Sequence, residues 1–401
     1  MALLSVEEAL RRVLDGVEAI GPEPVAIEQA RGRILGEPLQ ALLNQPPFNA
    51  SAMDGYAVRA ADIATLPATL AVIGEAPAGH PFSGSICSGE AVRIFTGAPV
   101  PEGADAIVIQ ENATRDGSRV VVQRGALEAE HIRGMGTDFR AGDALLAAGR
   151  RLGPREVSLA AAMGYGEVAV RRRPRVAILA TGDELVAPGS RPGPGQIIAS
   201  NHLGVAALAE AAGAEVEQLG IARDTRQDLG AHFAEAQDTD ILVTIGGASV
   251  GEHDLVAPVL EGRGMALAFW KIAMRPGKPL MFGRLGASRV LGLPGNPVSA
   301  LVCARLFLVP LIHAMLGLPA DGARPIQGRL AVPLEANGPR QHYMRAVCKP
   351  WADGSVLVTP VRSQDSSLLA PLAEADCLLI RPPNAPAAAP GACVPILPLD
   401  F

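Results

Sequence analysis

The chain has 401 residues, of which 49% are hydrophobic, 44 are glycine and 34 are proline. This length exceeds one compact core, so we expect two to four domains with many ordered turns. A formal net charge of −6 gives no electrostatic footprint for nucleic acid or for an anionic membrane. The five cysteines lie far apart without a C-x-x-C pair, so we expect neither a disulfide framework nor a zinc site, and a reducing compartment is favoured.

No segment reads as a membrane span or a signal peptide. The N-terminus has acidic residues and helical periodicity where a signal peptide needs a basic start and an apolar core. The most apolar long stretch, residues 301–318, is interrupted by Arg305, Pro310 and His313. We therefore expect a cytoplasmic protein that binds neither membranes nor nucleic acid.

The first third of the chain changes character twice. Ser5 is placed to cap a helix over residues 6–19, with Glu8 as its capping-box partner, and a helical turn is predicted at 30–35. Short alternating runs between turns then indicate a small inserted β domain, before helical periodicity returns at 154–163. We expect an α+β linking domain from residues 1–45 and 139–172, whose first helix is free to pack on the next domain, and an inserted domain at 46–138.

From residue 173 onward, strands alternate with helices. This alternation predicts a doubly wound, mostly parallel α/β sheet over residues 173–320, closed by a long helix at 297–316. The basic run at 171–175 is better explained as a solvated linker flank than as a nucleic-acid patch in an acidic chain. Strand-like runs with proline-rich turns predict a C-terminal β-barrel over residues 321–401.

The stretch 241–254 reads I-L-V-T-I-G-G-A-S-V-G-E-H-D, an apolar run followed by glycines and polar residues. Such a run suits a strand buried on both faces, and the glycines permit a tight turn with exposed N–H groups. A Gly-Gly pair alone is more often a surface turn between a strand and a helix. What favours a binding site is that ligands of open α/β sheets bind at the carboxyl ends of the strands, where further loops of this kind occur. The candidate ligand-binding residues there are Thr181, Gly182, Gly246, Gly247, Ser249, Gly251, Pro294, Gly295, Asn296 and Pro297.

Three carboxylates follow neighbouring strands: Glu184, Asp224 and Asp254. Each alone is better explained by helix capping or by a solvated turn. Together at adjacent strand ends they predict a Mg²⁺ site, because this ion prefers carboxylates, waters and substrate phosphates. The segment W-K-I-A-M-R-P-G-K-P supplies Lys271, Arg275 and Lys278 as candidate cations for an oxyanion, although ordinary surface charge is the alternative.

Six motifs together resemble a known family. They are P-P-F-N-A-S-A-M-D-G-Y-A, R-I-F-T-G-A-P-V-P-E-G-A-D-A-I-V, T-G-D-E-L, T-I-G-G-A-S-V-G-E-H-D, W-K-I-A-M-R-P-G-K-P and L-G-L-P-G-N-P-V-S. In this order they resemble the molybdopterin molybdenumtransferases, the MoeA family, which is related to the C-terminal domain of gephyrin. The resemblance implies an adenylyltransferase-like α/β domain, an elongated homodimer and a Mg²⁺-dependent reaction in which molybdate enters adenylylated molybdopterin and AMP leaves.

The resemblance also implies functional positions in this sequence. The catalytic positions would be Asp54, Thr96, Asp138, Glu184, Asp224, Asp254, Lys271 and Arg275. The first three would reach the crevice through folding or from a partner subunit. Further oxyanion-binding positions would be Lys278, Ser299, Arg345 and Ser366.

Two residues depart from the family pattern. Arg275 stands where many members have lysine, so the charge is kept while a planar fork replaces a compact ammonium group. Asp365 stands where a small or neutral residue is expected.

Two other functions are compatible with the same residues. The α/β domain alone would also serve a molybdopterin adenylyltransferase, and gephyrin's related domain acts as a scaffold. The sequence leaves open the choice between molybdate and tungstate. It also leaves open whether the adenylyltransferase and the molybdoenzyme acceptors are partners.

Overall fold

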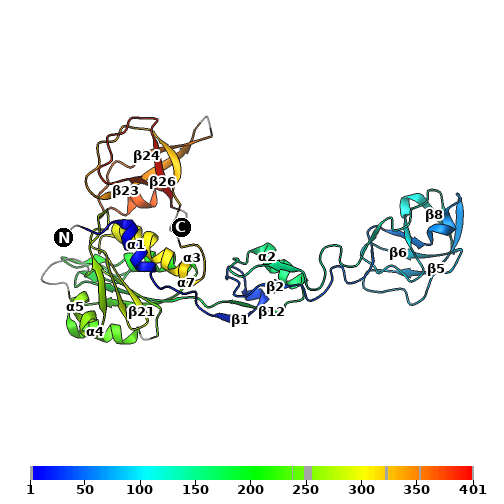
Figure 1. The fold of residues 1–401 in the computed structure, drawn as a ribbon, viewed down its shortest axis with the longest axis horizontal. Helices are drawn as coiled ribbons and strands as arrows, with labels where there is room; N and C mark the ends of the chain where they lie inside the picture. Colours follow the sequence, from blue (N-terminus) through cyan, green and yellow to red (C-terminus); the bar gives the residue numbers. More distant parts are fainter. Residues whose placement is uncertain (1–2, 237, 248–254, 321–323, 352–353, 400–401) are drawn as a thin grey trace. The chain divides into compact units, whose positions relative to one another are not determined.

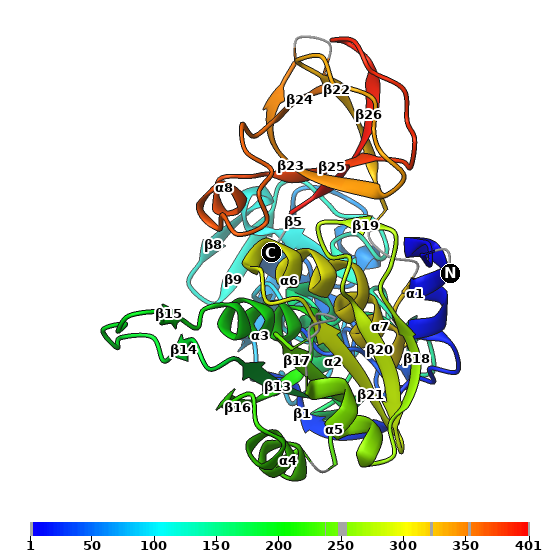
Figure 2. The ribbon, with the colours of Figure 1, turned by 90° about the vertical axis from the view of Figure 1, so that its left-hand side faces the viewer.

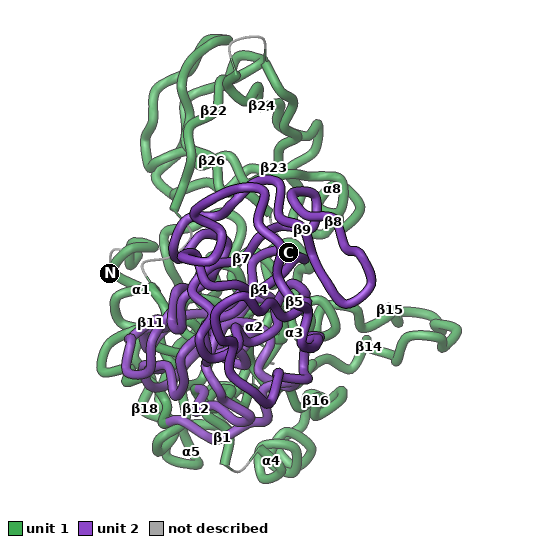
Figure 3. The backbone as a smooth tube through the Cα atoms, turned by 90° about the vertical axis from the view of Figure 1, so that its right-hand side faces the viewer, with its two compact units in different colours: residues 1–21, 171–401 green, residues 22–170 purple. Residues whose placement is uncertain are grey.

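The computed structural model describes residues 3–236, 238–247, 255–320, 324–351 and 354–399. The chain forms two compact units (Figures 1 and 3). Unit 1 comprises Met1–Gly21 and Arg171–Phe401, and unit 2 comprises Pro22–Val170. The N-terminal segment therefore belongs to the unit that contains the predicted α/β region.

Unit 1 is built on a six-stranded sheet with the strand order β16-β13-β17-β21-β20-β18. The first four strands pair in parallel, and β20 runs antiparallel to both of its neighbours, β21 and β18. All five residues of β17 are buried, as expected for a strand covered on both faces. The predicted doubly wound, mostly parallel sheet is confirmed. Its strands are β13 (Arg175–Thr181), β16 (Glu215–Ala222), β17 (Ile241–Ile245), β18 (Ala266–Trp270), β20 (Met281–Leu285) and β21 (Ser288–Leu293).

Helices cover both faces of this sheet (Figure 2). On one face, Leu229, Phe233 and Leu260 from two helices pack into a core with the sheet. On the other face, the remaining helices pack against one another. The helices are α1 (Val6–Leu14), α3 (Asn201–Ala212), α4 (Arg226–Glu235), α5 (Val256–Gly262), α6 (Pro297–Cys303) and α7 (Val309–Met315).

A π-helical turn, Ala304–Leu308, joins α6 to α7, where the sequence predicted one regular helix. Pro310 has no N–H to donate, which disturbs the regular hydrogen-bond ladder at this point. Among the described residues, Pro297–Met315 is the one helical stretch long and apolar enough to cross a membrane, with a mean hydropathy of 1.9. It is 78% buried within unit 1, as a core helix would be.

Helix α1 ends five residues before the predicted end. Its start agrees with the prediction, because the Ser5 hydroxyl accepts the backbone N–H of Glu8 at 3.1 Å. The Glu8 carboxylate bonds two arginines of the same helix and closes no capping box. Arg289 of β21 donates to the carbonyls of Val13 and Asp15 at 3.1 and 3.0 Å, which holds the helix on the sheet.

The C-terminal strands form a closed five-stranded barrel, which confirms the predicted barrel. The strands follow the order β23-β24-β22-β26-β25, and pairing of β23 with β25 closes the ring. The short β19 (Met274–Arg275) adds to the outside of β23. The barrel elements are β22 (Ile326–Leu330), β23 (Gln341–Pro350), β24 (Val356–Pro360), the helix α8 (Ala370–Ala373), β25 (Cys377–Arg381) and β26 (Cys393–Pro398).

Unit 2 contains a curled six-stranded sheet in the order β7-β4-β6-β5-β9-β8. A separate small core joins residues 27–41 to residues 139–170 around helix α2. The helical turn predicted at 30–35 is wrong, because the 3₁₀ turn lies earlier, at Ile27–Gln29. The main elements are β1 (Pro22–Ala26), β4 (Gly55–Val58), β5 (Ala68–Ala76), β6 (Glu90–Ile94), β7 (Ala106–Ile109), β8 (Ala113–Asp116), β9 (Arg119–Val122), α2 (Pro154–Ala162) and β12 (Glu167–Arg171).

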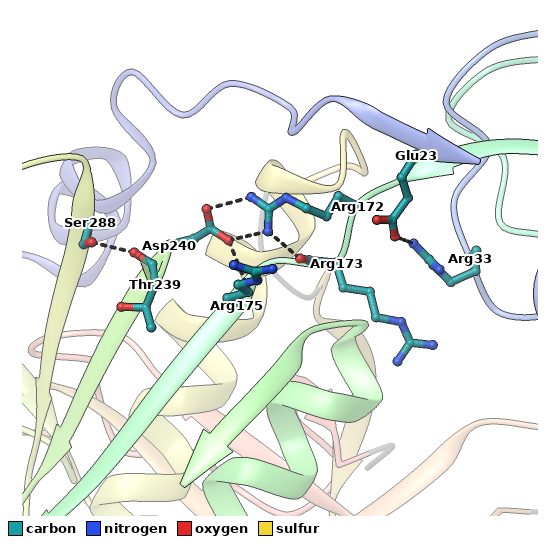
Figure 4. A network of polar contacts seen from close by, with 8 residues as sticks. All are labelled: Glu23, Arg33, Arg172, Arg173, Arg175, Thr239, Asp240 and Ser288. Atoms are coloured by element: carbon teal, nitrogen blue, oxygen red, sulfur yellow. Dashed lines mark hydrogen bonds and ion pairs between the residues drawn. The ribbon is translucent and has the colours of Figure 1, made fainter. Parts of the chain in front are cut away.

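Arg172, which follows β12, is tied to the central sheet (Figure 4). Its guanidinium donates to both carboxylate oxygens of Asp240 at 2.9 Å. The same carboxylate accepts the backbone N–H of Arg175 at 2.7 Å. Since Asp240 directly precedes β17, this bidentate pair holds the N-terminal end of that strand in place. The basic run at 171–175 therefore has a structural role at Arg172.

Candidate active site

A cavity of about 540 Å³ opens at the carboxyl ends of β13, β17 and β21. After β13, the chain adds β16 on one side of it and then β17 on the other side. The cavity therefore lies at the switch point where open α/β sheets bind ligands. Its lining includes Thr181, Gly182, Glu184, Leu185, Ile197, Ile198, Ser200, Asn201, His202, Asp224, Ile245, Gly246, Gly247, Pro279, Pro294, Gly295, Asn296, Pro297, Ser367 and Leu369.

The glycine pair after β17 is required by close packing. Gly246 has φ +97°, and a Cβ there would lie 2.4 Å from the carbonyl oxygen of Thr181. Gly247 has φ +58°, and a Cβ there would lie 2.4 Å from a methyl group of Val256. The N–H of Gly246 donates to the carbonyl of Leu293 at 3.1 Å, so it is not available to an anion. Ser249 and Gly251, predicted to extend this cradle, lie outside the described residues.

Two of the three predicted metal ligands stand on the cavity wall. Glu184 is exposed and folds back over Gly182, where a Cβ would lie 2.6 Å from its Oε2. Asp224 follows β16, and its backbone N–H donates to Asp183 Oδ1 at 3.2 Å. Asp254 lies outside the described residues. Within the described ranges, no cluster of three acidic, histidine or cysteine side chains could by itself hold a metal ion.

The loop before α6 is fastened from two sides. Asn201 at the start of α3 donates to the carbonyl of Gly295 at 2.6 Å. Asn296 donates to the hydroxyl of Ser366, a residue of the barrel, at 3.0 Å. Ser299 is buried in the first turn of α6. These bonds bring the predicted P-G-N-P loop and Ser366 together beside the cavity.

Arg345 holds the loop that contains Ser366. It is 1% exposed, and its guanidinium donates to the carbonyls of Ser363, Asp365 and Leu368 at 2.7–3.0 Å. Burial lowers the pKa of Arg345. With its donors used in this way, Arg345 shapes the loop, and it is not among the described residues that line the cavity.

The Asp365 departure has a local explanation. Its carboxylate accepts the backbone N–H and the hydroxyl of Ser367, both at 2.9 Å. These two bonds, together with the nearby Arg345, lower the pKa of Asp365. An aspartate fits this position because it caps its own turn.

The predicted cations lie on the segment between β18 and β20. Lys271 has φ +75°, a conformation that few non-glycine residues adopt. Arg275 lies in β19, opposite His342 of the barrel, and Lys278 is exposed. Burial, with Arg275 and two other arginines nearby, lowers the pKa of His342 to about 4. Pro279 of this segment lines the cavity, but no lysine or arginine is found among the described lining residues.

The remaining predicted catalytic residues lie in unit 2. The Asp54 carboxylate accepts the backbone N–H and the hydroxyl of Thr96, both at 2.8 Å. These bonds lower the pKa of Asp54. Asp138 is exposed, and its backbone N–H donates to the carbonyl of Gln45 at 2.9 Å. Asp54 and Thr96 thus form a pair, whereas no hydrogen bond or ion pair joins them to Asp138 within the described part of the chain.

Replacing Thr96 by valine should raise the pKa of Asp54 partway to its usual value. Only the hydroxyl bond is lost, and the backbone bond, which lowers the pKa of Asp54 more, remains. A depressed carboxyl pKa stabilises the fold above the unfolded-state pKa, and this stabilisation is lost as pH falls through the folded-state pKa. As the pH is lowered, the free energy of unfolding of the variant should therefore fall less than that of the wild-type protein. NMR titration of the carboxyl carbons measures the pKa of Asp54. Thr114→Val on β8 is the control and should leave this pKa unchanged. An unchanged Asp54 pKa in Thr96→Val would refute the pairing.

His202 was missed by the sequence interpretation. It lies in the first turn of α3, beside Asn201, and lines the cavity with 7% of the residue's surface exposed. Ser200 stands at the N-cap of this helix but makes no side-chain capping bond. The sequence did offer one signal, which is the position of His202. Residues 200–202 begin a predicted helix, and this helix starts beside the cavity at the switch point of the sheet.

An open α/β sheet with a cavity at its switch point, joined to a closed barrel and a second unit of curled sheet, defines a multidomain small-molecule-binding protein. Family models match residues 4–164 as the "MoeA N-terminal region (domain I and II)" and residues 177–314 as a "Probable molybdopterin binding domain". Residues 327–399 match the "MoeA C-terminal region (domain IV)".

Known proteins resemble the chain over nearly its full length. The molybdopterin molybdenumtransferase of Haemophilus influenzae is 36% identical over 94% of each chain. Molybdopterin molybdenumtransferase 2 of Mycobacterium tuberculosis is 36% identical over 91% of this chain and 93% of its own. The crystal structure of a molybdopterin biosynthesis MoeA protein from Pyrococcus horikosii matches with a TM-score of 0.85 at 31% identity, covering 100% of both chains. The chain belongs to the MoeA family of molybdopterin molybdenumtransferases, which confirms the predicted resemblance.

Proposed function

We propose that the protein is a transferase of molybdenum cofactor biosynthesis that inserts molybdate into adenylylated molybdopterin and releases AMP. The names of its curated relatives support the transferase reaction. The observation that carries the proposal is the cavity at the sheet's switch point, with Glu184 and Asp224 on its wall. This cavity lies in the region that matches the molybdopterin-binding family model.

Glu184 and Asp224 fit a Mg²⁺ ion as hard oxygen ligands, and we propose Asp254 as the third. Gly182 supports this fit, because any side chain there would meet the Glu184 carboxylate. When bound, magnesium offsets the charge of the phosphate oxygens as the anhydride breaks. The chain's own contribution is to place both carboxylates in the short turns that follow β13 and β16, so that little order must be gained when substrate binds.

We propose that Lys271, Arg275 and Lys278 hold molybdate. They lie on one short segment around Pro276-Gly277, whose ends are fixed by backbone bonds to neighbouring strands. A turn fixed in this way presents positive charge with little loss of chain entropy on binding. Pro279, which directly follows Lys278, lines the cavity, so the segment of the cations leads into the cavity wall.

Replacing Arg275 by alanine should raise the molybdate concentration needed for half-maximal turnover far more than that of adenylylated molybdopterin. Loss of one charge-assisted contact is worth about 1.5–3 kcal/mol, or on the order of tenfold to a hundredfold. Steady-state AMP release at varied molybdate measures the effect. Arg263→Ala, which removes an arginine at the end of α5, is the control and should change neither concentration. If the half-maximal concentration of adenylylated molybdopterin rose more than that of molybdate, Arg275 would bind the pterin substrate instead.

The reaction is tested by incubating the protein with adenylylated molybdopterin and magnesium, with and without molybdate. Molybdate-stimulated AMP release supports the proposal. With molybdopterin and MgATP instead, release of pyrophosphate would favour the rival adenylyltransferase. Tight binding of receptor-tail peptides without turnover would favour the gephyrin-like scaffold.

The family resemblance supports further proposals about organisation. We expect a cytoplasmic homodimer that receives its substrate from the adenylyltransferase and serves molybdoenzyme acceptors. In it, residues 46–138 would be the inserted domain, 1–45 with 139–172 the linking domain, 173–320 the molybdopterin-binding domain and 321–401 the barrel domain. Light scattering measures the oligomeric state, and a monomer would contradict the dimer.

A further inference from the structure

The pair formed by Asp54 and Thr96 in unit 2 joins two segments that lie 42 residues apart in the chain. Both of its hydrogen bonds end on Oδ1 of the carboxylate. Among the described residues, no side chain or backbone group donates to Oδ2, so this oxygen is free to contact a substrate. Its direction depends on what holds the two segments together, and the side chain of Arg93 contacts both of them.

Arg93 is fixed to the segment that contains Asp54. It stands opposite Tyr56 in the pairing of β6 with β4, and its guanidinium carbon lies 5.1 Å from the centre of the tyrosine ring. Its Nη1 donates to the carbonyl of Gly55, which directly follows Asp54, at 3.3 Å. A Cβ on Gly55 would lie 2.0 Å from the carbonyl oxygen of Val108, so the backbone that Arg93 binds is itself tightly packed.

Arg93 is also fixed to the segment that contains Thr96. Its guanidinium carbon lies 5.0 Å from the centre of the Phe95 ring, and Phe95 directly precedes Thr96. A third connection is made through Gln110, whose side-chain oxygen accepts a bond from Nη2 of Arg93 at 2.7 Å. The backbone N–H of Gln110 in turn donates to the carbonyl of Asp54 at 3.0 Å. A guanidinium suits this place because it stacks on aromatic rings and donates in two directions at once.

We propose that Arg93 is a positioning residue that holds Asp54 and Thr96 in the geometry that the transferase reaction needs. Both Nη1 and Nη2 donate to acceptors of the protein, so Arg93 acts through the pair. The inference rests on the proposed function, since it takes Asp54 as part of the catalytic machinery.

The charge of Arg93 has a second and smaller effect. The pKa of Asp54 is lowered first by the two bonds from Thr96 and to a lesser degree by the positive charge of Arg93. Displacement of the pair would therefore raise this pKa more than the loss of the charge would. The pKa of Asp54 thus reports on the geometry of the pair.

The variants Arg93→Lys and Arg93→Met separate positioning from charge. Lysine keeps the charge without the planar fork, whereas methionine keeps apolar contact with the two rings and has neither. We expect the bonds from Thr96 to Asp54 to loosen in both variants. NMR titration of the carboxyl carbons should therefore show a raised Asp54 pKa in both. A raised pKa in Arg93→Met with an unchanged pKa in Arg93→Lys would mean that only the charge matters.

Turnover should fall roughly tenfold to a hundredfold in both variants, because displacement of a catalytic group by about 1 Å costs up to this much. The concentrations of molybdate and adenylylated molybdopterin needed for half-maximal turnover should change by less than about twofold, as expected when an interaction serves the reaction step and not binding. Steady-state AMP release with molybdate measures both quantities.

Arg115→Met is the matched control. Arg115 on β8 belongs to the same sheet and also donates to a backbone carbonyl, that of Gly117 at 3.1 Å, but this bond lies within one exposed hairpin. The control should leave the Asp54 pKa and turnover unchanged. Gln110→Leu, at an exposed position, removes one connection of Arg93 and should lower turnover by about threefold to tenfold. If the Arg93 variants do not fold, Gln110→Leu decides alone.

An unchanged Asp54 pKa in Arg93→Lys, or wild-type turnover in both Arg93 variants, would overturn the positioning role. Thermal unfolding of the same variants shows whether Arg93 supports the fold alone, which would lower stability and leave the Asp54 pKa and turnover unchanged. Failure of the proposed function looks different. The Asp54 pKa would still rise in both Arg93 variants, but the wild-type protein would release no AMP with molybdate.

Discussion

Asp224→Asn is expected to leave the protein folded and to lower turnover by roughly a hundredfold or more. The side chain lies at the end of β16 on the cavity wall, where it contributes little to the core. Removing one carboxylate from a magnesium site forfeits charge neutralisation worth several kcal/mol, and about 1.4 kcal/mol corresponds to tenfold in rate. AMP release and circular dichroism measure the two effects together.

Glu217→Gln is the matched control for this variant. Glu217 is an exposed carboxylate within β16, the strand that Asp224 follows, and it does not line the cavity. Its loss should leave turnover within about twofold, because surface substitutions change little. Near wild-type activity of Asp224→Asn, or equal losses in both variants, would contradict the metal-binding role. We expect the same loss of turnover in Asp254→Ala as in Asp224→Asn.

Gly246→Ala should destabilise the protein by about 3 kcal/mol or more. The new Cβ would meet the carbonyl oxygen of Thr181 at 2.4 Å, and φ +97° is itself unfavourable for alanine. Neither partner can move aside without shifting a buried strand, because β13 and β17 are paired along their length. Chemical denaturation followed by circular dichroism measures the loss.

Gly264→Ala separates the steric clash from the backbone strain. Gly264 has φ +98°, almost the same conformation, but a Cβ there meets nothing within 4 Å. This variant should lose only the strain energy, about 1–2 kcal/mol. The difference between the two variants therefore isolates the contact with β13. Equal destabilisation would mean that the glycine loop is looser than the structure indicates.

The sheet could be predicted because its signal is local. The composition of the apolar run 241–245 and of the neighbouring strands is enough to predict that they are buried. Their alternation with helices predicts that the strands pair in parallel. Element ends were less predictable. Helix α1 stops at Leu14, and the helix after Pro297 contains a π-helical turn, because both features depend on contacts with distant residues.

The candidate site was predicted where residues follow strand ends. Glu184, Asp224, the glycine pair and the P-G-N-P loop all line one cavity, since carboxyl ends of parallel strands meet at one edge. The direction of long side chains could not be predicted. Arg345 has the residue type of an anion ligand, yet its donors are used by backbone carbonyls of a neighbouring loop.

His202 is the opposite case, a residue that lies at the cavity although the sequence did not predict it. One histidine among seven has no distinguishing sequence pattern, and only burial beside a cavity without a partner marks it. Likewise, Asp54 and Thr96 are 42 residues apart, and their two hydrogen bonds follow from the folding of unit 2. Long-range pairing of this kind depends on register, which short motifs do not encode.

The most direct test of the central claim is a single turnover with adenylylated molybdopterin, magnesium and molybdate. AMP is quantified in the supernatant, and molybdenum bound to the pterin dithiolene is quantified by mass spectrometry of the same sample. The account predicts equal amounts of AMP released and molybdenum inserted, with both lost in Asp224→Asn. AMP release without molybdenum in the pterin product, or insertion that leaves the adenylate attached, would contradict it.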